Sequence, residues 1–508
     1  MNKMESPPAS PEPPAFSGRH QRPRPPAAAR FTPPRSRSPL VKLGWWGIAG
    51  YLAYATYVAL HGNPSGALAG SIVVFFSLLP AILWAARGAG DFPIFPLYAF
   101  TFSYTFGLQM MNNRQIVAIT PPDLFWTTCL AIGGFLVIAT LTWLAVTRKP
   151  VTPPRVVMVV GGTRAEPVLL GCLVLATAFH VSGAAGWLGW LGAFGTIVRA
   201  FMFCLGTLSI FILSYEIGKG RVSRGRRILF FSLLTVSMIA LSTGLLLVQA
   251  MGTGLLALAS FIFASHRVPW KTVIGFILLI SILHYGKYSM REKYWGDDGI
   301  GGPSFQPWQY PALMTEWFGA GLNYYLQPGE AREQEHTNLL ERSGLLHLFL
   351  FVQDQTERRP LMMGQTYSVL PSLLMPRILA PDRAGAHEST TLLNIYFGLQ
   401  SREDTQNTTI GWGLFNEAYA NFGYAGLAGL AVILGGFFGW IARLSKGCPV
   451  NSYQGLLAVV VMNTAYQSEY SSGVFVTVLF QSVVALTVLR FIIMRPVRLE
   501  SPAPFGGS

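Results

Sequence analysis

Residues 407–429, NTTIGWGLFNEAYANFGYAGLAG, place an ionisable side chain at the threshold of the apolar run LAVILGGFFGWIA. Glu417 and Asn421 lie four residues apart, so on a helix they share one face. Ionisable groups at the edge of apolar segments are costly, and they commonly mark acid–base or ion-binding chemistry. This pair is therefore a candidate site, and a polar helix cap that seals a loop is the simpler alternative.

Cationic side chains lie near the ends of other apolar segments. Arg199 stands just inside the start of one segment, and Arg291 follows the end of another. His180 and His284 approach the same level. Taken singly, each has a plain structural explanation, because an arginine near a helix end can reach the interface and a histidine can pack in a core. All four side chains are predicted to lie on the same side of the membrane, and this common position favours a functional site.

The segment GQTYSVLPSLLMPRILAPDRAGAHEST, residues 364–390, carries a third group of candidates. Its three prolines break it into turns, which would hold Arg377 and Arg383 in a fixed setting. His387 lies near its end and lacks the second histidine, one helical turn away, that an HExxH zinc site uses. The segment therefore predicts two fixed cations and one histidine near the membrane interface.

Sequence patterns of several common enzyme classes are absent. No P-loop, HExxH or GxSxG occurs. The nearest acidic pairs, at 297–298 and 403–404, lie in turn-like stretches and do not resemble a divalent cation site. The cysteines have unrelated spacings and are expected to be packing residues: Cys129, Cys172, Cys204 and Cys448. We expect no metal and no cofactor.

The composition excludes an ordinary soluble domain. Of 508 residues, 51% are hydrophobic and only 12% are charged, and the mean hydropathy is +0.41. These values predict a polytopic protein of the lipid bilayer. The net charge of +14 does not indicate nucleic acid as a partner, because the Lys and Arg residues are dispersed between apolar segments.

Apolar runs of about 20 residues, the length that crosses the hydrocarbon core, predict an all-α bundle of about twelve transmembrane helices. Between the seventh and eighth, LSTGLLLVQAMGTGLLALAS fits either a tight hairpin or one long broken helix. The predicted spans are 43–61, 66–86, 92–111, 123–147, 167–185, 196–215, 228–247, 251–265, 272–288, 424–442, 453–469 and 472–493.

The loops between these spans alternate in charge. Basic stretches such as RKPVTPPR and GKGRVSRGRR alternate with short loops that contain a single cation, Arg114. Because cytoplasmic loops carry the excess of Lys and Arg, both ends of the chain are predicted to be cytoplasmic. The protein is then expected in the inner (cytoplasmic) membrane, with one large external loop between the ninth and tenth spans.

This pattern divides the chain into five parts. Residues 1–42 are Pro- and Arg-rich, have no apolar period, and are predicted to be a disordered cytoplasmic tail. Spans one to nine occupy 43–288, and the external loop with short interfacial helices occupies 289–408. Spans ten to twelve occupy 409–494, and residues 495–508 form a second cytoplasmic tail.

The order of a large external loop, GQTYSVLPSLLMPRILAPD, and NTTIGWGLFNEAYANFGYAGLAG leading into a span resembles the oligosaccharide repeat unit polymerases, which are the Wzy-type O-antigen and exopolysaccharide polymerases. The specific resemblance covers residues 364–436, and the rest of the chain agrees in architecture only. Many relatives carry an arginine after a small-residue turn in a middle span, where this chain offers only Gln249.

The resemblance implies a glycosyltransferase that moves a growing glycan from a polyprenyl diphosphate carrier to a hydroxyl of the next lipid-linked unit, with inversion and without a metal. Cations would hold the diphosphate and stabilise its developing charge. Glu417 would act as the base, with His387 as second choice. A flippase and a chain-length regulator would be further partners. The residues implied to bind the diphosphate or substrate are Arg199, Arg291, Arg377, Arg383 and Asn421.

Two alternatives remain open. An O-antigen ligase or O-oligosaccharyltransferase has the same outline and differs in its acceptor. A transporter or flippase is the commonest role for a chain with twelve spans, and such proteins often contain internal repeats. No repeat relates the two halves of this chain, and a long loop after the ninth span breaks any such symmetry.

Overall fold

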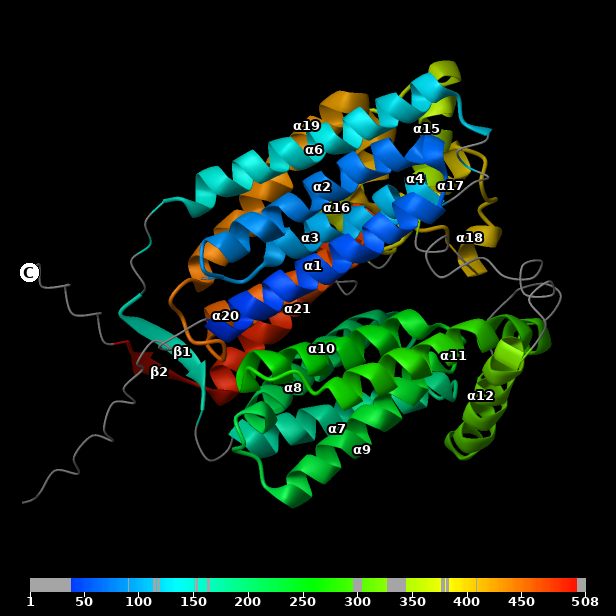
Figure 1. Cartoon of the computed structure of the whole chain (residues 1–508). Coiled ribbons are helices and arrows are strands. Elements are labelled where there is room, and N and C mark those ends of the chain that lie inside the picture. The colour runs from blue at the N-terminus through cyan, green and yellow to red at the C-terminus, as the bar shows by residue number, and fades with distance from the viewer. Residues whose placement is uncertain are drawn as a thin grey trace, which may run out of the picture.

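The computed structural model describes most of the chain between residues 38 and 499, and this part is mainly helical (Figure 1). The predicted N-terminal tail lies outside the described residues, except for its last few positions. Within 38–499, the residues not described are 90, 113–115, 117–118, 150, 152–153, 162–164, 296–303, 327–343, 376–379, 381–382 and 408.

Each predicted span coincides with a helix or a run of helices. In the described part of the chain, nine helices are long and apolar enough to cross a membrane, which indicates a multi-pass membrane protein. These are α2 (Pro64–Ala86), α6 (Pro122–Thr147), α7 (Ala165–Ala184), α8 (Gly195–Gly218, apolar from Phe201), α9 (Arg224–Ser242), α10 (Leu247–Ser265), α11 (Trp270–Tyr294), α19 (Gly413–Ser445) and α21 (Ser472–Ile493).

The other three predicted spans are not among these nine helices. The first is α1 (Ser38–His61), and the eleventh is the short α20 (Tyr453–Ala465). The third is a run of α3 (Ile94–Phe102), the π-helical turn η1 (Ser103–Gly107) and α4 (Leu108–Asn112). Twelve crossings therefore remain a prediction.

The helices form two groups that lie side by side (Figure 1). The first group contains α1 to α6 and α19, and the second contains α7 to α11. Helices α20 and α21 join them, because Ala458 and Phe475 pack in the core of the first group whereas Leu456 and Leu486 pack in that of the second. Residues far apart in the sequence thus share one bundle.

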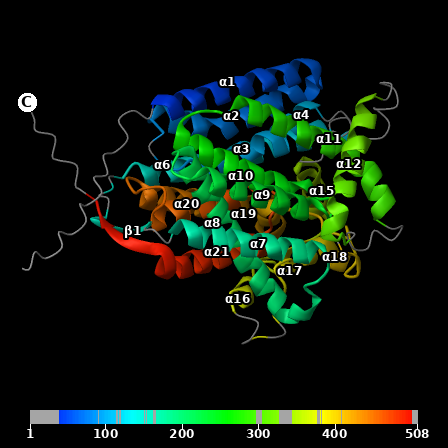
Figure 2. The same cartoon turned by 90° about the horizontal axis from the view of Figure 1, so that it is seen from below.

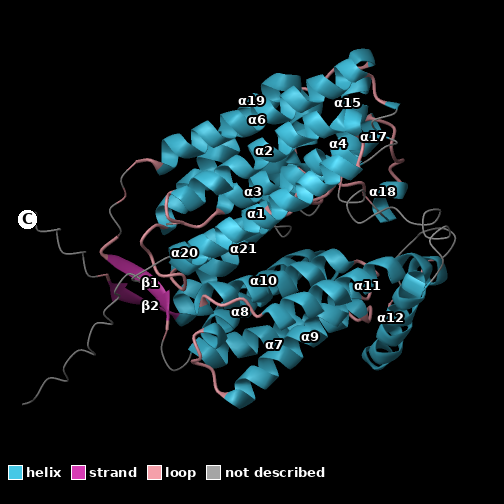
Figure 3. Cartoon of the chain, viewed as in Figure 1, coloured by secondary structure: helices cyan, strands magenta, loops and turns pink. Residues whose placement is uncertain are grey.

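A small sheet adds to the predicted all-α fold. Strand β1 (Val156–Val160) pairs antiparallel with β2 (Met494–Arg498), and Val157 lies opposite Val497 (Figure 3). The described part of the chain is otherwise mainly helical, and β2 includes the first residues of the predicted C-terminal tail. Strand β1 follows the basic stretch RKPVTPPR, and β2 itself contains the basic stretch RPVR directly after α21. The charge pattern assigns both stretches to the same side, and the pairing shows that they meet at one end of the bundle, called the sheet end below.

The opposite end carries the helices of the predicted external loop, and it is called the loop end below (Figures 1 and 2). They are η3 (Pro307–Gln309), α12 (Tyr310–Leu326), α15 (Leu346–Arg358), α16 (Leu370–Leu373), α17 (Glu388–Tyr396) and α18 (Asp404–Asn407). The structure also decides between the two interpretations of spans seven and eight. Helix α9 ends at Ser242 and α10 begins at Leu247, so they form a tight hairpin.

Helix α19 is sharply kinked near its start. Gly423 has φ +60° and ψ −144°, a conformation that is essentially restricted to glycine. The predicted span at 424–442 therefore begins directly after the kink, and residues 413–422 form a separate short stretch at the loop end. That stretch carries Glu417 and Asn421.

Candidate functional site

Glu417 is completely buried between α19 and α21. Its Oε2 accepts a hydrogen bond from the backbone N–H of Ser472 at 2.5 Å, and its Oε1 accepts one from Ser472 Oγ at 2.6 Å. Ser472 is the first residue of α21, where backbone N–H groups have no partner within the helix and negative charge is favoured. The carboxylate of one helix thus caps another.

Asn421 is also fully buried, and all of its described hydrogen bonds are internal. Its Nδ2 donates to Thr366 Oγ1 and to the backbone oxygen of Glu417, each at 2.8 Å, and its Oδ1 accepts from the Gly364 N–H at 3.1 Å. The N–H groups of Met362 and Met363 donate to the carbonyls of Ala420 and Asn421. Residues 362–366 are therefore fastened to the start of α19.

Helix α17 completes this buried polar network. Ser389 Oγ donates to the carbonyl of Thr366 at 3.0 Å, and the hydroxyl groups of Thr390 and Ser471 are 2.7 Å apart. The backbone of Ala386 lies so close to α21 that a Cβ on Gly473 would come within 2.7 Å of its carbonyl oxygen. Three stretches, 362–366, 386–390 and 471–473, thus converge on the start of α19.

His387 and Arg383 lie in the same part of the loop end. His387 is exposed, precedes α17, and accepts a hydrogen bond from the Thr391 N–H through its backbone oxygen at 2.9 Å. Arg383 is half-buried, and its guanidinium donates to the carbonyl of Leu373 at 2.8 Å. The structure therefore brings the backbone around His387 and Arg383 to the elements that hold Glu417 and Asn421.

Of the other predicted cations, Arg291 and Arg199 lie on other helices of the described structure. Arg291 on α11 donates two hydrogen bonds to the carbonyl of Leu245, at 2.9 and 3.2 Å, and its guanidinium lies 4.3 Å from the Trp295 ring centre. Leu245 belongs to the α9–α10 turn and has φ +56°, so Arg291 braces that turn. Arg199 is exposed on α8. Arg377 lies outside the described residues.

Sequence reasoning missed the partners of the predicted residues. Ser472, Thr366 and Ser389 are buried and hold the network together. The stretch SEYSSG before an apolar run is a typical helix start, but nothing in it indicates a carboxylate 55 residues earlier. Tyr367 was missed as well; burial raises its pKa, and the nearby Glu417 carboxylate raises it further.

Among the residues that the structure describes, no group of His, Cys, Asp and Glu side chains is arranged to hold a metal ion. The network instead consists of hydroxyl, amide and carboxylate groups at the loop end, with an exposed histidine and a half-buried arginine beside it. The buried network is held by internal hydrogen bonds, so a polar ligand at this end would meet the histidine and the arginine beside it. In comparisons with known proteins, no family model, no curated protein and no solved structure matches this chain.

Proposed function

We propose that this protein is a membrane glycosyltransferase that joins polyprenyl-diphosphate-linked oligosaccharide repeat units into a surface polysaccharide. The observation that carries the proposal is the contact between the two stretches on which the family resemblance rests. Gly364 and Thr366 of the first stretch bond to Asn421 of the second, and Thr366 in turn accepts from Ser389. Residues that resemble the polymerases in sequence thus form one connected unit.

The position of this unit suits a lipid-linked substrate. It lies at the loop end, next to the kink at Gly423 where α19 enters its long apolar stretch. A substrate whose carrier is in the bilayer presents its diphosphate and sugars at that level. Polyprenyl diphosphate is a good leaving group, so the reaction needs cations at the diphosphate more than it needs acid catalysis. In the proposal, Arg383 supplies one such cation beside the network, and Arg199, Arg291 and Arg377 remain candidates for the others.

The burial of Glu417 favours His387 over Glu417 as the base in this proposal. Both oxygens of Glu417 accept hydrogen bonds from Ser472, so an acceptor hydroxyl would reach this carboxylate only after that contact opens. A general base must lie within hydrogen-bond reach of the proton that it removes. The exposed His387 needs no such opening. We therefore assign the base to His387 and make Glu417 a positioning residue, together with Asn421.

The experiment is deletion of the gene followed by analysis of lipid-linked glycans. Polymerisation predicts that single lipid-linked repeat units accumulate, and expression of the intact chain should restore long polymer. Long polymer that forms but stays unattached would indicate a ligase instead. Repeat units that remain on the cytoplasmic side would indicate a flippase. Normal consumption of single units in the deletion strain would exclude the proposed function.

A further inference from the structure

Helix α12 does not follow the direction of the long helices. Figures 1 and 2 both show it running obliquely across the part of α11 that lies at the loop end. The two helices touch through glycines. A Cβ on Gly286 would lie 2.6 Å from the backbone N of Gly321, and a Cβ on Gly321 would lie 2.1 Å from the carbonyl oxygen of Ile282. This backbone contact leaves no room for a side chain, so it fixes where α12 crosses α11.

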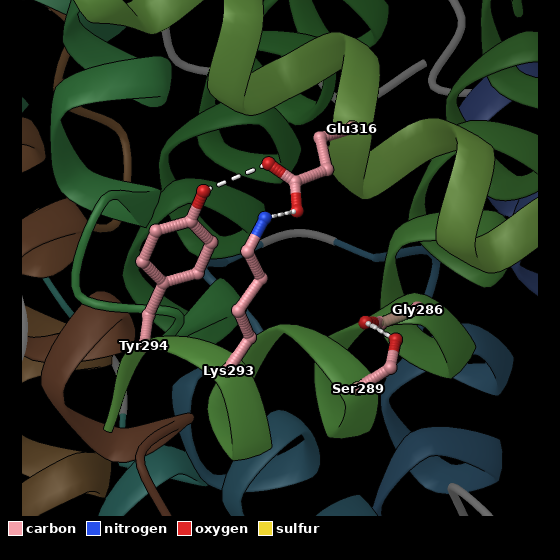
Figure 4. A network of polar contacts seen from close by, with 5 residues as sticks. All are labelled: Gly286, Ser289, Lys293, Tyr294 and Glu316. Carbon is pink, nitrogen blue, oxygen red and sulfur yellow. Dashed lines mark hydrogen bonds and ion pairs between the residues drawn. The ribbon is translucent and has the colours of Figure 1, made fainter. Parts of the chain in front are cut away.

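Polar contacts at the crossing and near the end of α11 hold α12 against α11. Near the end of α11, Lys293 Nζ and the Tyr294 hydroxyl donate to the two oxygens of Glu316 at 2.5 and 2.8 Å (Figure 4). At the crossing itself, Trp317 Nε1 donates to the carbonyl of Leu283 at 2.7 Å. The position of α12 is therefore determined along much of its length.

The C-terminal end of α12 lies farther from the loop end than the C-terminal end of α11 does. The hydroxyl groups of Tyr325 and Ser281 are 2.6 Å apart, and the Tyr324 ring stacks on Tyr285 with centres 4.3 Å apart. Ser281 precedes Tyr288, the end of the predicted span, by 7 residues, or about 10 Å along the helix axis. With α11 crossing a hydrocarbon layer of about 30 Å, Tyr325 lies at about a third of its depth.

The outward face of α12 is apolar. Glu316 is its one charged residue, and that side chain is used in the contact with α11. Phe318 and Leu322 are about two-fifths exposed, and Leu326 is 81% exposed. At the depth of Tyr325, this exposed face of α12 would contact the acyl chains of the lipid. Exposed Ile277 on α11 belongs to the same range of depth.

We propose that α12 is a re-entrant helix that dips from the loop end into the adjacent leaflet, with its outward face covered by the acyl chains of that leaflet. The chain does not complete a crossing there, because the next described residues lie again at the loop end. Leu345 donates its N–H to the carbonyl of Thr105 in η1, and Gly344 lies against Gln109 of α4. This inference does not depend on the proposed function.

The test measures the depth of single spin labels in phosphatidylcholine vesicles. The four native cysteines are replaced, and a cysteine at position 322 or 326 is labelled with a nitroxide. Labels at Ile277 and at the exposed Arg402 serve as lipid and water references. We expect collisions with oxygen to exceed those with a water-soluble nickel chelate several-fold at 322 and 326, as at 277. Nickel accessibility like that at 402 would overturn the proposal, and so would protection from both reagents, which would indicate a covering protein.

A matched glycine pair tests the crossing itself. Gly321→Ala introduces a Cβ into the backbone of α11, whereas Gly319→Ala places one where no atom lies within 4 Å. We expect Gly321→Ala to shift the label at 326 to a shallower depth and Gly319→Ala to leave it unchanged. An unchanged depth in Gly321→Ala would show that the glycine contact does not place α12.

Discussion

The carboxylate of Glu417 in α19 caps the first turn of α21 through two hydrogen bonds to Ser472, a residue 55 positions later in the chain. The contact connects α19 to α21 at the loop end. Because α21 packs in the cores of both helix groups, the contact lies where the two groups meet. Glu417, a polar residue at the start of a span, therefore joins two helices. Its sequence position allows two roles, a functional site or a helix cap, and the cap is the simpler of the two.

Glu417→Gln should destabilise the protein. Glutamine keeps the shape of the side chain but turns an NH₂ group toward one of the two donors of Ser472. A buried donor without an acceptor costs about 1–3 kcal/mol. Thermal unfolding of the purified protein in detergent should therefore show a lower Tm. The exposed Glu403→Gln is the control and should leave Tm unchanged. Equal Tm values for the two variants would contradict the capping role.

Asn421→Ala should loosen residues 362–366. The change removes two donated hydrogen bonds and the acceptor of the Gly364 N–H. A loss of about 1–3 kcal/mol corresponds to roughly fivefold to 150-fold faster amide exchange in this segment. Hydrogen exchange followed by mass spectrometry measures it. The exposed Asn323→Ala on α12 is the matched control. Unchanged exchange at 362–366 would mean that other contacts fasten the segment.

Gly423→Ala should cost more than another Gly→Ala change in the same helix. Gly423 has a φ of +60°, where an alanine is strained by about 1–3 kcal/mol. Gly429 is helical, and a Cβ there meets no atom within 4 Å. Unfolding in denaturant should show a loss for Gly423→Ala and none for Gly429→Ala. Equal stability would indicate that α19 can straighten at the kink.

A cysteine pair at positions 157 and 497 should cross-link. These residues lie directly opposite each other in the sheet, and their side chains point to the same face. In a protein without its native cysteines, a short thiol cross-linker should join this pair. It should leave the pair 156 and 497 unlinked, since adjacent strand residues point to opposite faces. Cross-linking of both pairs would contradict the register.

The same cysteines test the predicted orientation. A cytoplasmic sheet end requires that a membrane-impermeant thiol reagent, added to spheroplasts, does not label a single cysteine at the exposed position 156. Permeabilised cells provide the control, in which labelling should appear. Labelling in intact spheroplasts would reverse the topology and place the candidate site on the cytoplasmic side.

His387→Ala should abolish polymer formation without removing the protein from the membrane. Loss of a general base commonly lowers the rate about 10²–10⁴-fold, and His387 is exposed, so its removal creates no cavity. Polymer length on gels and the amount of protein in membranes are the two measurements. His61→Ala, at an exposed position at the end of α1, is the control. Full activity of His387→Ala would return the assignment to Glu417.

The sequence by itself determined the class of the protein and the place of its helices. Apolar runs of about 20 residues leave the backbone no alternative to a helix in a bilayer, and the helices accordingly fall on the predicted segments. Pro371, which the structure does describe, lies at the start of α16, because the effect of a proline on the backbone is local. The sequence also singled out the candidate residues between 383 and 421, because polar side chains near the start of a span can be recognised without knowing their neighbours; that they form a functional site stays a prediction.

Only the tertiary structure decided what these residues touch. The sheet joins residues 156–160 to 494–498, and the side chains of Glu417 and Ser472 meet across 55 residues. Such pairings depend on how two helix groups pack, which hydrophobic periodicity does not encode. The structure likewise gave Arg291 a local partner at Leu245. The sequence could place a charge at the edge of a span, but burial and hydrogen bonds decide whether that charge faces a substrate or another helix.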